Sequence, residues 1–311
     1  MKKILFSILA MAAMAACATD EPIALNQEAI QFGNAFVDNS VRGAVDPSYG
    51  TANNLTSLKV YGAVEGVNFY DDVEIRGTLG AAVWNFVGTV PTQYWIDGAD
   101  YVFDAVVDAT SVEQHLATLL PVSLHYEASS QKDMLHKRVT CTGKINETGV
   151  VPFTFTHLLS KVKFTVENTT AEAATGYQYT ITEIALTNAY VEGDYAVSDG
   201  TWTYGDTNET YSHAIADMTI ASNTTEECET EVLLIPGASV GITFKVNVQM
   251  YNTVTDEFET ITTTTKPYTN VVTLEANKAY NFKVSVGLNQ EIKFTATTLD
   301  AWVPVEKPLN N

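Results

Sequence analysis

Apolar and polar residues alternate along most of this 311-residue chain, and alternation with a period of two predicts β-strands. Clear examples are residues 58–64, 100–107, 177–189 and 242–251, with Gly, Pro, Asn or Asp in the connections. Residues 83–86 and 93–96 are shorter candidates, and 111–119 is expected to form a helical turn or a loop. No segment has the 3.6-residue periodicity of an amphipathic helix. The pattern therefore predicts an all-β protein.

Short strands with frequent turns are typical of β-sandwiches, and the length suits two domains in tandem. Strand 151–157 is expected to end the first half, and strand 158–166 to begin the second. This places the N-terminal β-sandwich at 43–157 and the C-terminal one at 158–311, which ends in a hairpin of 280–286 and 291–298. No short repeat or low-complexity linker marks the boundary.

The first residues have the features of a secretory signal peptide, with Lys2 and Lys3 followed by an apolar stretch at 4–14. The small residues Ala15 and Ala16 come directly before Cys17, as in the lipobox of a bacterial lipoprotein. We therefore predict that residues 1–16 are removed and that Cys17 is diacylated, which would attach the chain stably to a membrane. Ordinary secretion with cleavage after Ala16 is the alternative.

The charge of the chain limits its partners. It has 37 acidic and 17 basic residues and a net charge of −20, which disfavours nucleic acid and anionic lipid. Hydrophobic residues make up 46% of the chain, enough to exclude a disordered protein. Cys141 and Cys228 lie far apart in the sequence, and we favour two separate thiols over a disulfide.

Residues that could carry chemistry do not combine into a recognisable site. Gly237–Gly241 fits the GxSxG pattern, but the strand-like 242–248 follows where a nucleophile elbow requires a helix. The histidines lack metal-ligand spacing, the acidic pairs suit solvated turns better than calcium or glycosidase sites, and the tryptophans suit a core better than sugar stacking. These residues are His115, His125, His136, His157, His213, Asp71, Asp72, Glu226, Glu227, Trp84, Trp95, Trp202 and Trp302. The sequence thus predicts no enzyme, no cofactor and no metal.

The stretch from Cys17 to Gly43 contains the features on which the functional prediction depends. Residues 29–37 alternate as one strand, with Ile30, Phe32 and Phe36 as its apolar positions. The turn-prone 38–44 follows and contains Arg42, one of only three arginines, the others being Arg76 and Arg138. From these residues alone, Arg42 is either a surface arginine in a loop or a site that a protease can reach.

Five segments resemble the fimbrillin family, the type V pilin lipoproteins of Gram-negative anaerobes. They are the lipobox, residues 36–43, residues 58–62, residues 153–164 and residues 299–302. The most specific is the Phe-x-His-x-x-Ser-Lys-Val-x-Phe block that runs from Phe155 to Phe164. The resemblance covers essentially the whole chain.

The resemblance implies two tandem transthyretin-like β-sandwich domains and export as an outer-membrane lipoprotein. It also implies that 17–42 is a lipidated propeptide with a removable first strand, and that an Arg-specific protease cuts between Arg42 and Gly43. Val41 stands where the family often has Thr. The released pilin is expected to polymerise with other pilin subunits by donor-strand exchange in a fimbrium that serves adhesion. The donor is expected to be the C-terminal segment, with apolar residues Ile292, Phe294, Ala296, Leu299 and Trp302.

Three alternatives remain open. The chain could be an uncleaved anchor or accessory fimbrial lipoprotein that keeps its lipid. It could instead be a monomeric surface lipoprotein that binds glycans through an exposed aromatic platform, or a secreted hydrolase with a converging carboxylate or Ser–His pair. Pro304 and Pro308 weaken a long donor strand in the tail, so stalk and tip roles are both compatible with the sequence.

Overall fold

The computed structural model describes residues 28–37, 55–78, 80–169, 176–205, 209–213, 218–228, 231–287 and 292–299. Within these ranges the chain is built of β-strands, and its one helical element is the 3₁₀ turn η2 (Ala128–Ser130). The all-β prediction is confirmed. No helix in the described ranges is long and apolar enough to cross a membrane.

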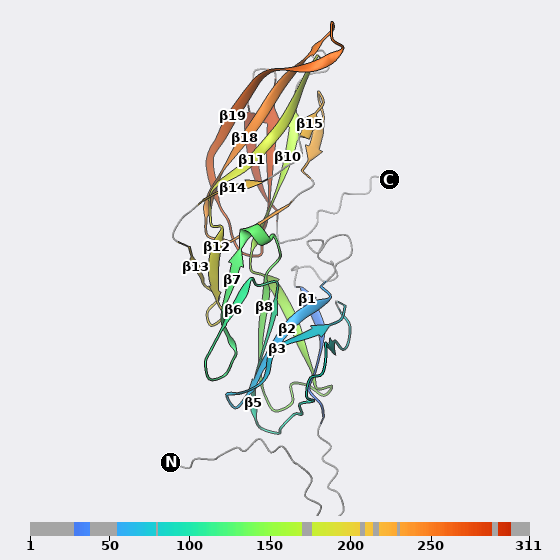
Figure 1. Ribbon diagram of the computed structural model, residues 1–311, viewed down its shortest axis with the longest axis vertical. Helices are drawn as coiled ribbons and strands as arrows, with labels where there is room; N and C mark the ends of the chain where they lie inside the picture. The colour runs from blue at the N-terminus through green and yellow to red at the C-terminus, as the bar shows by residue number, and fades with distance from the viewer. Residues whose placement is uncertain are drawn as a thin grey trace, which may run out of the picture.

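The first half, residues 28–157, lies at the lower end of the long axis in Figure 1. Its main sheet has the order β1-β9-β8-β5-β2-β3-β4 among the described residues. The strands of this half are β1 (Gln31–Val37), β2 (Ser57–Val64), β3 (Val67–Arg76), β4 (Asn85–Phe86), β5 (Asp100–Val107), β6 (Ser111–Gln114), β7 (Pro121–Glu127), β8 (Leu135–Thr142) and β9 (Val150–His157).

The inward residues of this sheet form an aromatic core, which we call the first-half core. Tyr70, Tyr101, Phe103 and Phe153 are its largest fully buried members apart from those of β1 and Phe155. Burying an aromatic side chain contributes about 1.5–3 kcal/mol, so these residues contribute strongly to the stability of the first half.

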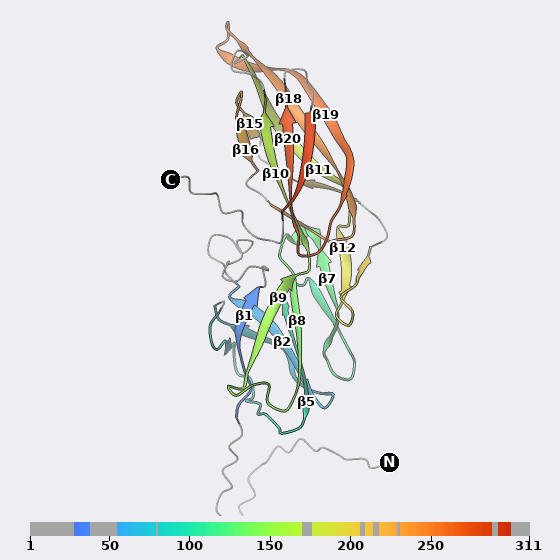
Figure 2. The same ribbon diagram turned by 180° about the vertical axis from the view of Figure 1, so that it is seen from behind.

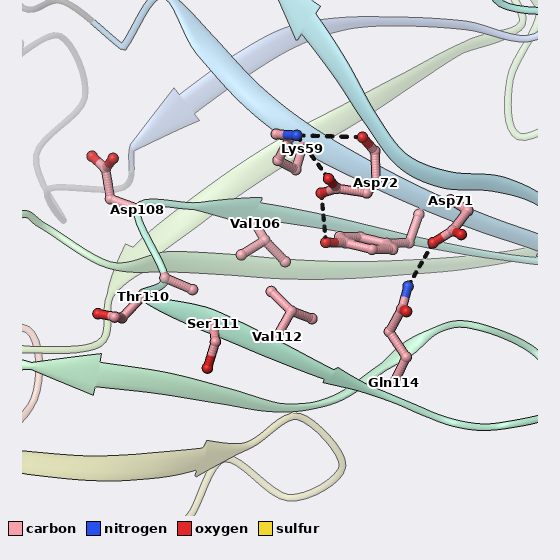
Figure 3. A pocket seen from close by; sticks show the side chains of 11 residues that line it. Lys59, Asp71, Asp72, Val106, Asp108, Thr110, Ser111, Val112 and Gln114 are labelled. Atoms are coloured by element: carbon pink, nitrogen blue, oxygen red, sulfur yellow. Dashed lines mark hydrogen bonds and ion pairs between the residues drawn. The ribbon is translucent and has the colours of Figure 1, made fainter.

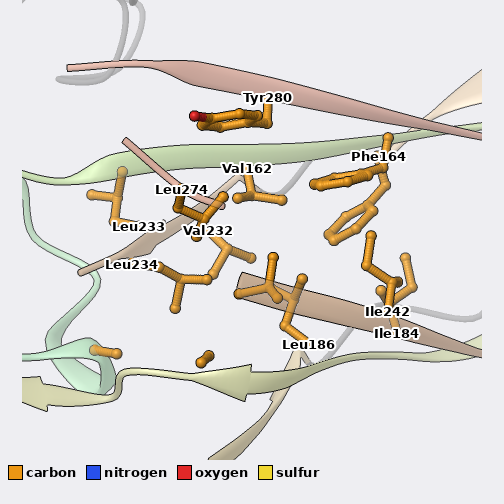
Figure 4. Packing of buried hydrophobic residues seen from close by; sticks show 14 of the residues in the cluster. Val162, Phe164, Ile184, Leu186, Val232, Leu233, Leu234, Ile242, Leu274 and Tyr280 are labelled. Atoms are coloured by element: carbon orange, nitrogen blue, oxygen red, sulfur yellow. The ribbon is translucent and has the colours of Figure 1, made fainter. Parts of the chain in front are cut away.

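The second half contains two further sheets, with Val162 and Phe164 of one facing Ile184, Leu186 and Ile242 of the other in Figure 4. In the described part of this half the sheet orders are β16-β10-β20-β21 and β14-β11-β18-β19, with β17 and β15 as additional edge pieces. The strands are β10 (Ser160–Asn168), β11 (Tyr177–Ala189), β12 (Glu192–Ala196), β13 (Trp202–Tyr204), β14 (Glu209–His213), β15 (Met218–Ile220), β16 (Thr225–Glu227), β17 (Val232–Leu234), β18 (Ser239–Asn252), β19 (Glu257–Thr273), β20 (Ala279–Val286) and β21 (Ile292–Leu299).

A small sheet of order β13-β12-β7-β6 joins the two halves (Figure 1). Strand β7 comes from the first half and pairs antiparallel with β12 of the second, from Glu127 opposite Glu192 to Ser123 opposite Ala196. Leu124 and Tyr126 of β7 are fully buried in the core of the second half. Residues of β7 therefore pack with the second half, and both the domain boundary near His157 and the transthyretin-like assignment stay predictions.

Part of the strand pairing of the first half recurs in the second, although the second half divides it between two sheets. In each half the first strand is parallel to a late one, β1 to β9 and β10 to β20. The strands between them also pair in the same sequence, β2 with β5 and β5 with β8, then β11 with β18 and β18 with β19. The halves are therefore related in hydrogen-bonding pattern, although the sequence contains no evident repeat.

Two local predictions were wrong. Residues 111–114, expected as a helical turn or loop, form strand β6, because β7 offers them an antiparallel partner. Residues 93–96, expected as a strand, form only a bridge between Tyr94 and Ala29. The tryptophans fit the preferred interpretation as packing residues, since Trp84 and Trp95 are buried and Trp202 is half-buried.

Candidate functional site

Strand β1 lies in a slot of the first half, beside the late strand β9 (Figure 2). The two strands are parallel, with Gln31 opposite Val150 and Phe32 opposite Val151. Two neighbouring parallel strands cannot be joined by a tight hairpin and need a long connection. Strands β1 and β9 therefore pair although they lie far apart in the sequence. Their pairing is a non-local feature of the fold.

The opposite edge of β1 is also hydrogen-bonded, to the irregular segment 80–95. The amide of Ile30 donates to the Gln93 carbonyl at 2.8 Å, and the amide of Asn34 donates to the Ala81 carbonyl at 2.7 Å. The amide of Trp84 donates to the Phe32 carbonyl at 2.7 Å. Strand β1 therefore has backbone partners on both edges, as a central strand does.

The inward face of β1 completes the first-half core. Ile30 and Phe32 are 2% and 1% exposed. The Phe32 ring centroid lies 5.6–5.9 Å from those of four other aromatic residues. These neighbours come from four different elements and are Tyr70, Phe86, Phe103 and Phe153. Without β1, the centre of this cluster would be empty and open to water.

A β-bulge changes the register within β1. The pairing shifts between Gly33 and Phe36, and Asn34 has a left-handed φ of 47°. The extra residue reverses the alternation, so Ala35 takes the next buried position at 1% exposed. Phe36 pairs through its backbone with Thr154, and its side chain lies outside the described residues. Ile30 and Phe32 are thus buried as expected, whereas Ala35 was missed because alternation cannot reveal a bulge.

Gly33 sits where segment 80–95 crosses β1 most closely. A Cβ atom at this position would lie 2.0 Å from the carbonyl oxygen of Ala82, which no side chain permits. Glycine is therefore required by the approach of two backbones.

The start of β1 is fixed by Glu28. Its carboxylate pairs with the ammonium group of Lys144, and its backbone carbonyl accepts a hydrogen bond of 3.0 Å from the Trp95 amide. The Trp95 indole in turn donates to the carbonyl of Gly149, the residue before β9. One end of β1 is thus attached to both walls of the slot.

The proposed processing residues Cys17, Arg42 and Gly43 lie outside the described residues, as does Trp302. The candidate donor residues Ile292, Phe294, Ala296 and Leu299 lie on β21, whose side chains are not described. Strand β21 pairs antiparallel with β20 and forms the edge of its sheet within the described chain. An edge strand can leave its sheet by breaking one ladder of hydrogen bonds.

The two arginines that the structure describes are both in strands. Arg138 is on β8 and makes an ion pair with Asp104, with Nη2–Oδ2 at 2.8 Å. Arg76 ends β3 and pairs with Ser57 and Asn85 on its two sides. Proteases act on extended, unpaired segments, so neither position offers a good substrate.

The other candidate chemistry has structural explanations. Ser239 of the GxSxG match begins strand β18, and its hydroxyl bonds to that of Thr273 at 2.8 Å. His136 pairs with Asp104 at 2.8 Å, and His157 pairs with Asp133 at 2.6 Å. No group of three or more His, Cys, Asp or Glu residues suited to a metal occurs in the described ranges. Cys141 and Cys228 are free thiols, and burial raises the pKa of Cys141, which makes it less reactive.

Comparison with known proteins identifies the family. Residues 49–302 match the model of the fimbrillin-like family. This chain belongs to the fimbrillin-like family. The resemblance seen in the sequence is therefore confirmed, and no curated protein sequence matches the chain significantly.

Three solved structures share the fold over 89% of this chain. A fimbrial protein of Bacteroides vulgatus has a TM-score of 0.61 at 11% identity, with its whole chain covered. Candidate cell adhesion proteins of Bacteroides ovatus and Bacteroides uniformis have TM-scores of 0.55 and 0.54, at 19% and 14% identity, with 99% and 98% of their chains covered. At these identities the likeness concerns the fold.

Proposed function

We propose that this fimbrillin-like protein is a pilin subunit whose first strand is removed by proteolysis and replaced by a strand of another subunit. The proposal rests on the position of β1, which is hydrogen-bonded to β9 on one edge and to segment 80–95 on the other, with Phe32 at the centre of the first-half core. Membership of the fimbrillin-like family and a shared fold with a fimbrial protein support it.

In this proposal the chain is exported as a lipoprotein through Cys17 and displayed at the outer membrane. An Arg-specific protease then cuts between Arg42 and Gly43. The cut lies between β1 and β2 (Ser57–Val64), so it separates the strand from the remainder of the first half. The lipid leaves together with β1.

Loss of β1 would leave an apolar groove with unpaired backbone groups, which another strand could fill. Ile30 and Phe32 are both buried, and refilling their positions is worth about 3–6 kcal/mol at 1.5–3 kcal/mol for each large side chain. The two freed backbone edges add about 0.5–1.5 kcal/mol for each hydrogen bond re-formed. An inserted strand would therefore dissociate slowly, as a fimbrium requires.

Strand β21 is the candidate donor. Its Ile292-Lys293-Phe294 repeats the Ile30-Gln31-Phe32 pattern of β1, so Ile and Phe could enter the same two positions. In that alignment Thr295 falls where β1 has Gly33, and its side chain requires segment 80–84 to move away from the strand. The donor would be accommodated only after that wall of the groove opens slightly.

The test is to digest the purified full-length precursor with an Arg-specific protease and sequence the new N-terminus. Arg42→Lys is the matched control, because it keeps the charge and removes the recognised residue. We expect a product that begins at Gly43 and ladders of polymer that survive mild heating in SDS, both missing from the control. An intact Arg42 in a folded, monomeric protein would instead favour an uncleaved anchor or accessory fimbrial lipoprotein with a permanent β1.

A further inference from the structure

A polar cavity of about 460 Å³ lies between the main sheet of the first half and β6 of the small joining sheet. One wall is formed by β2, β3 and Val106 of β5, which are neighbours in one sheet, and the other by residues 108–114, which include β6 (Figure 3). None of the lining residues belongs to β1 or β9. Cavities of roughly 300–1,000 Å³ are the usual size of small-molecule sites.

A bulge in β3 aims two neighbouring carboxylates at this cavity. The pairing of β2 with β3 slips between Val60 and Gly62, so Asp71 and Asp72 together oppose Tyr61. Asp72 has a left-handed φ of 50°, and both aspartates are exposed where strict alternation would bury one of them. Bulges re-aim side chains in this way beside functional sites.

The carboxylates are held by groups of both walls. Asp72 accepts hydrogen bonds from Lys59 at 2.9 Å and from the Tyr61 hydroxyl at 2.8 Å. Asp71 accepts one of 2.6 Å from the Gln114 amide across the cavity, as the dashed line in Figure 3 shows. The second oxygen of Asp71 and the amide oxygen of Gln114 have no hydrogen-bond partner within the described chain.

Between these polar groups the cavity has an apolar patch of Val106 and Val112, which lie near its middle in Figure 3. The site therefore combines carboxylate and amide acceptors, an ammonium donor and aliphatic surface. Sugar hydroxyl groups both donate and accept hydrogen bonds, and the C–H faces of a sugar ring pack on aliphatic side chains. A sugar unit can use all three features at once.

The charge of the lining selects among ligands. Asp71, Asp72 and Asp108 outnumber Lys59, and the whole chain is strongly acidic, so anionic ligands are repelled. We propose that this cavity binds an uncharged sugar unit of a glycan. The site needs no aromatic platform, because the hydrogen bonds of Asp71 and Gln114 supply the specificity.

The proposal deepens the adhesive role and does not depend on strand exchange, since the cavity is complete in the single chain. Its test uses unprocessed, monomeric protein, so failure of sugar binding and failure of polymerisation can be told apart. The protein is applied to an array of glycans with uncharged, sialylated or sulfated ends. The strongest uncharged glycan is then titrated by calorimetry.

Asp71→Ala and Gln114→Ala are the informative variants, and Glu113→Ala is the matched control on the same strand outside the cavity. We expect Asp71→Ala to weaken binding about tenfold and Gln114→Ala about threefold or more, at about 1.4 kcal/mol for each factor of ten. Glu113→Ala should bind like the native protein, and the melting temperature of each variant verifies its fold.

Several results would overturn the proposal. They are the absence of binding to every uncharged glycan, a preference for sialylated or sulfated ends, and equal affinity in all three variants. Capture of a lysine-rich peptide with higher affinity than any glycan would show a cation site and would overturn it as well.

Discussion

The substitution Phe32→Ala tests whether β1 is removed during assembly or stays in the protein permanently. Phe32 is 1% exposed and its ring contacts four aromatic neighbours, so truncation leaves a cavity that the surrounding sheet cannot fill. Core Phe→Ala substitutions cost about 3–5 kcal/mol of unfolding free energy. We expect that loss in the full-length precursor, measured by urea denaturation.

The processed subunit should behave differently. After cleavage at Arg42 and strand exchange, the residue at position 32 has left with the propeptide. The polymer made from Phe32→Ala precursor should therefore resist heat and SDS as well as polymer made from the native precursor. The Phe32→Ala substitution should therefore lower the stability of the precursor but not that of the polymer.

Phe153→Ala provides the matched control. Phe153 lies on β9, is fully buried and stacks on Phe32 with centroids 5.8 Å apart. It stays in the chain after cleavage, so its loss should weaken both precursor and polymer. If the Phe32→Ala precursor does not fold, Phe32→Leu gives a smaller change of the same kind. The reasoning is refuted if Phe32→Ala weakens polymer and precursor equally, or if it leaves the precursor unchanged.

Three further changes test single contacts. Gly33→Val should destabilise the precursor by about 1–3 kcal/mol or more in urea denaturation, because its Cβ meets the Ala82 carbonyl at 2.0 Å; unchanged stability would mean that the backbones do not approach so closely. Arg138→Met leaves the fully buried Asp104 carboxylate without its bidentate partner and should cost roughly 2–4 kcal/mol by the same assay, whereas a cost below about 0.5 kcal/mol would contradict this. Desolvation raises the pKa of the exposed Asp108 carboxyl group more than the nearby Lys132 ammonium group lowers it, so its charged form is slightly disfavoured in the folded protein and stability falls as pH rises through that pKa. Asp108→Asn should therefore raise the melting temperature more at pH 7 than at pH 3, and an equal gain at both would assign the effect to its left-handed φ of 51° alone.

Alternation predicted those strands that keep a regular period of two along their length. Residues 177–189 were predicted as one strand and form β11 with the same ends, and the last hairpin is β20 with β21. Both cases depend on a regular period of two, and the hairpin also depends on a short connection. The strand β11 itself was predictable, but its pairing with β18, with Tyr177 opposite Met250, was not. The pairing of β7 with β12 links residues about 70 apart, and no pattern in either segment indicates which strand it pairs with.

The candidate site was predictable only in part for a similar reason. Ile30 and Phe32 follow from alternation, but the bulge at Asn34 moves the next inward position to Ala35. The wall at 80–95 holds only the short strand β4 and isolated bridges, and its brief alternating pieces do not indicate that it packs on β1, although Gly33 is a signal of close backbone approach. The bulge at Asp71 and Asp72, which shapes the proposed sugar site, appears in the sequence only as an acidic pair.

In the proposed mechanism, the partly repeated strand pairing accounts for why the first half, and not the second, loses a strand. Strand β10 occupies in the second half the position that β1 occupies in the first, parallel to the late strand. However, β10 follows β9 after only two residues and continues to β11, so both of its ends are tied to described parts of the fold. Strand β1 is joined to the rest of its half only through residues 38–56, where Arg42 lies. A single cut there frees β1 from its half, whereas β10 would need two, and the same architecture therefore supports exchange at only one of its two equivalent positions.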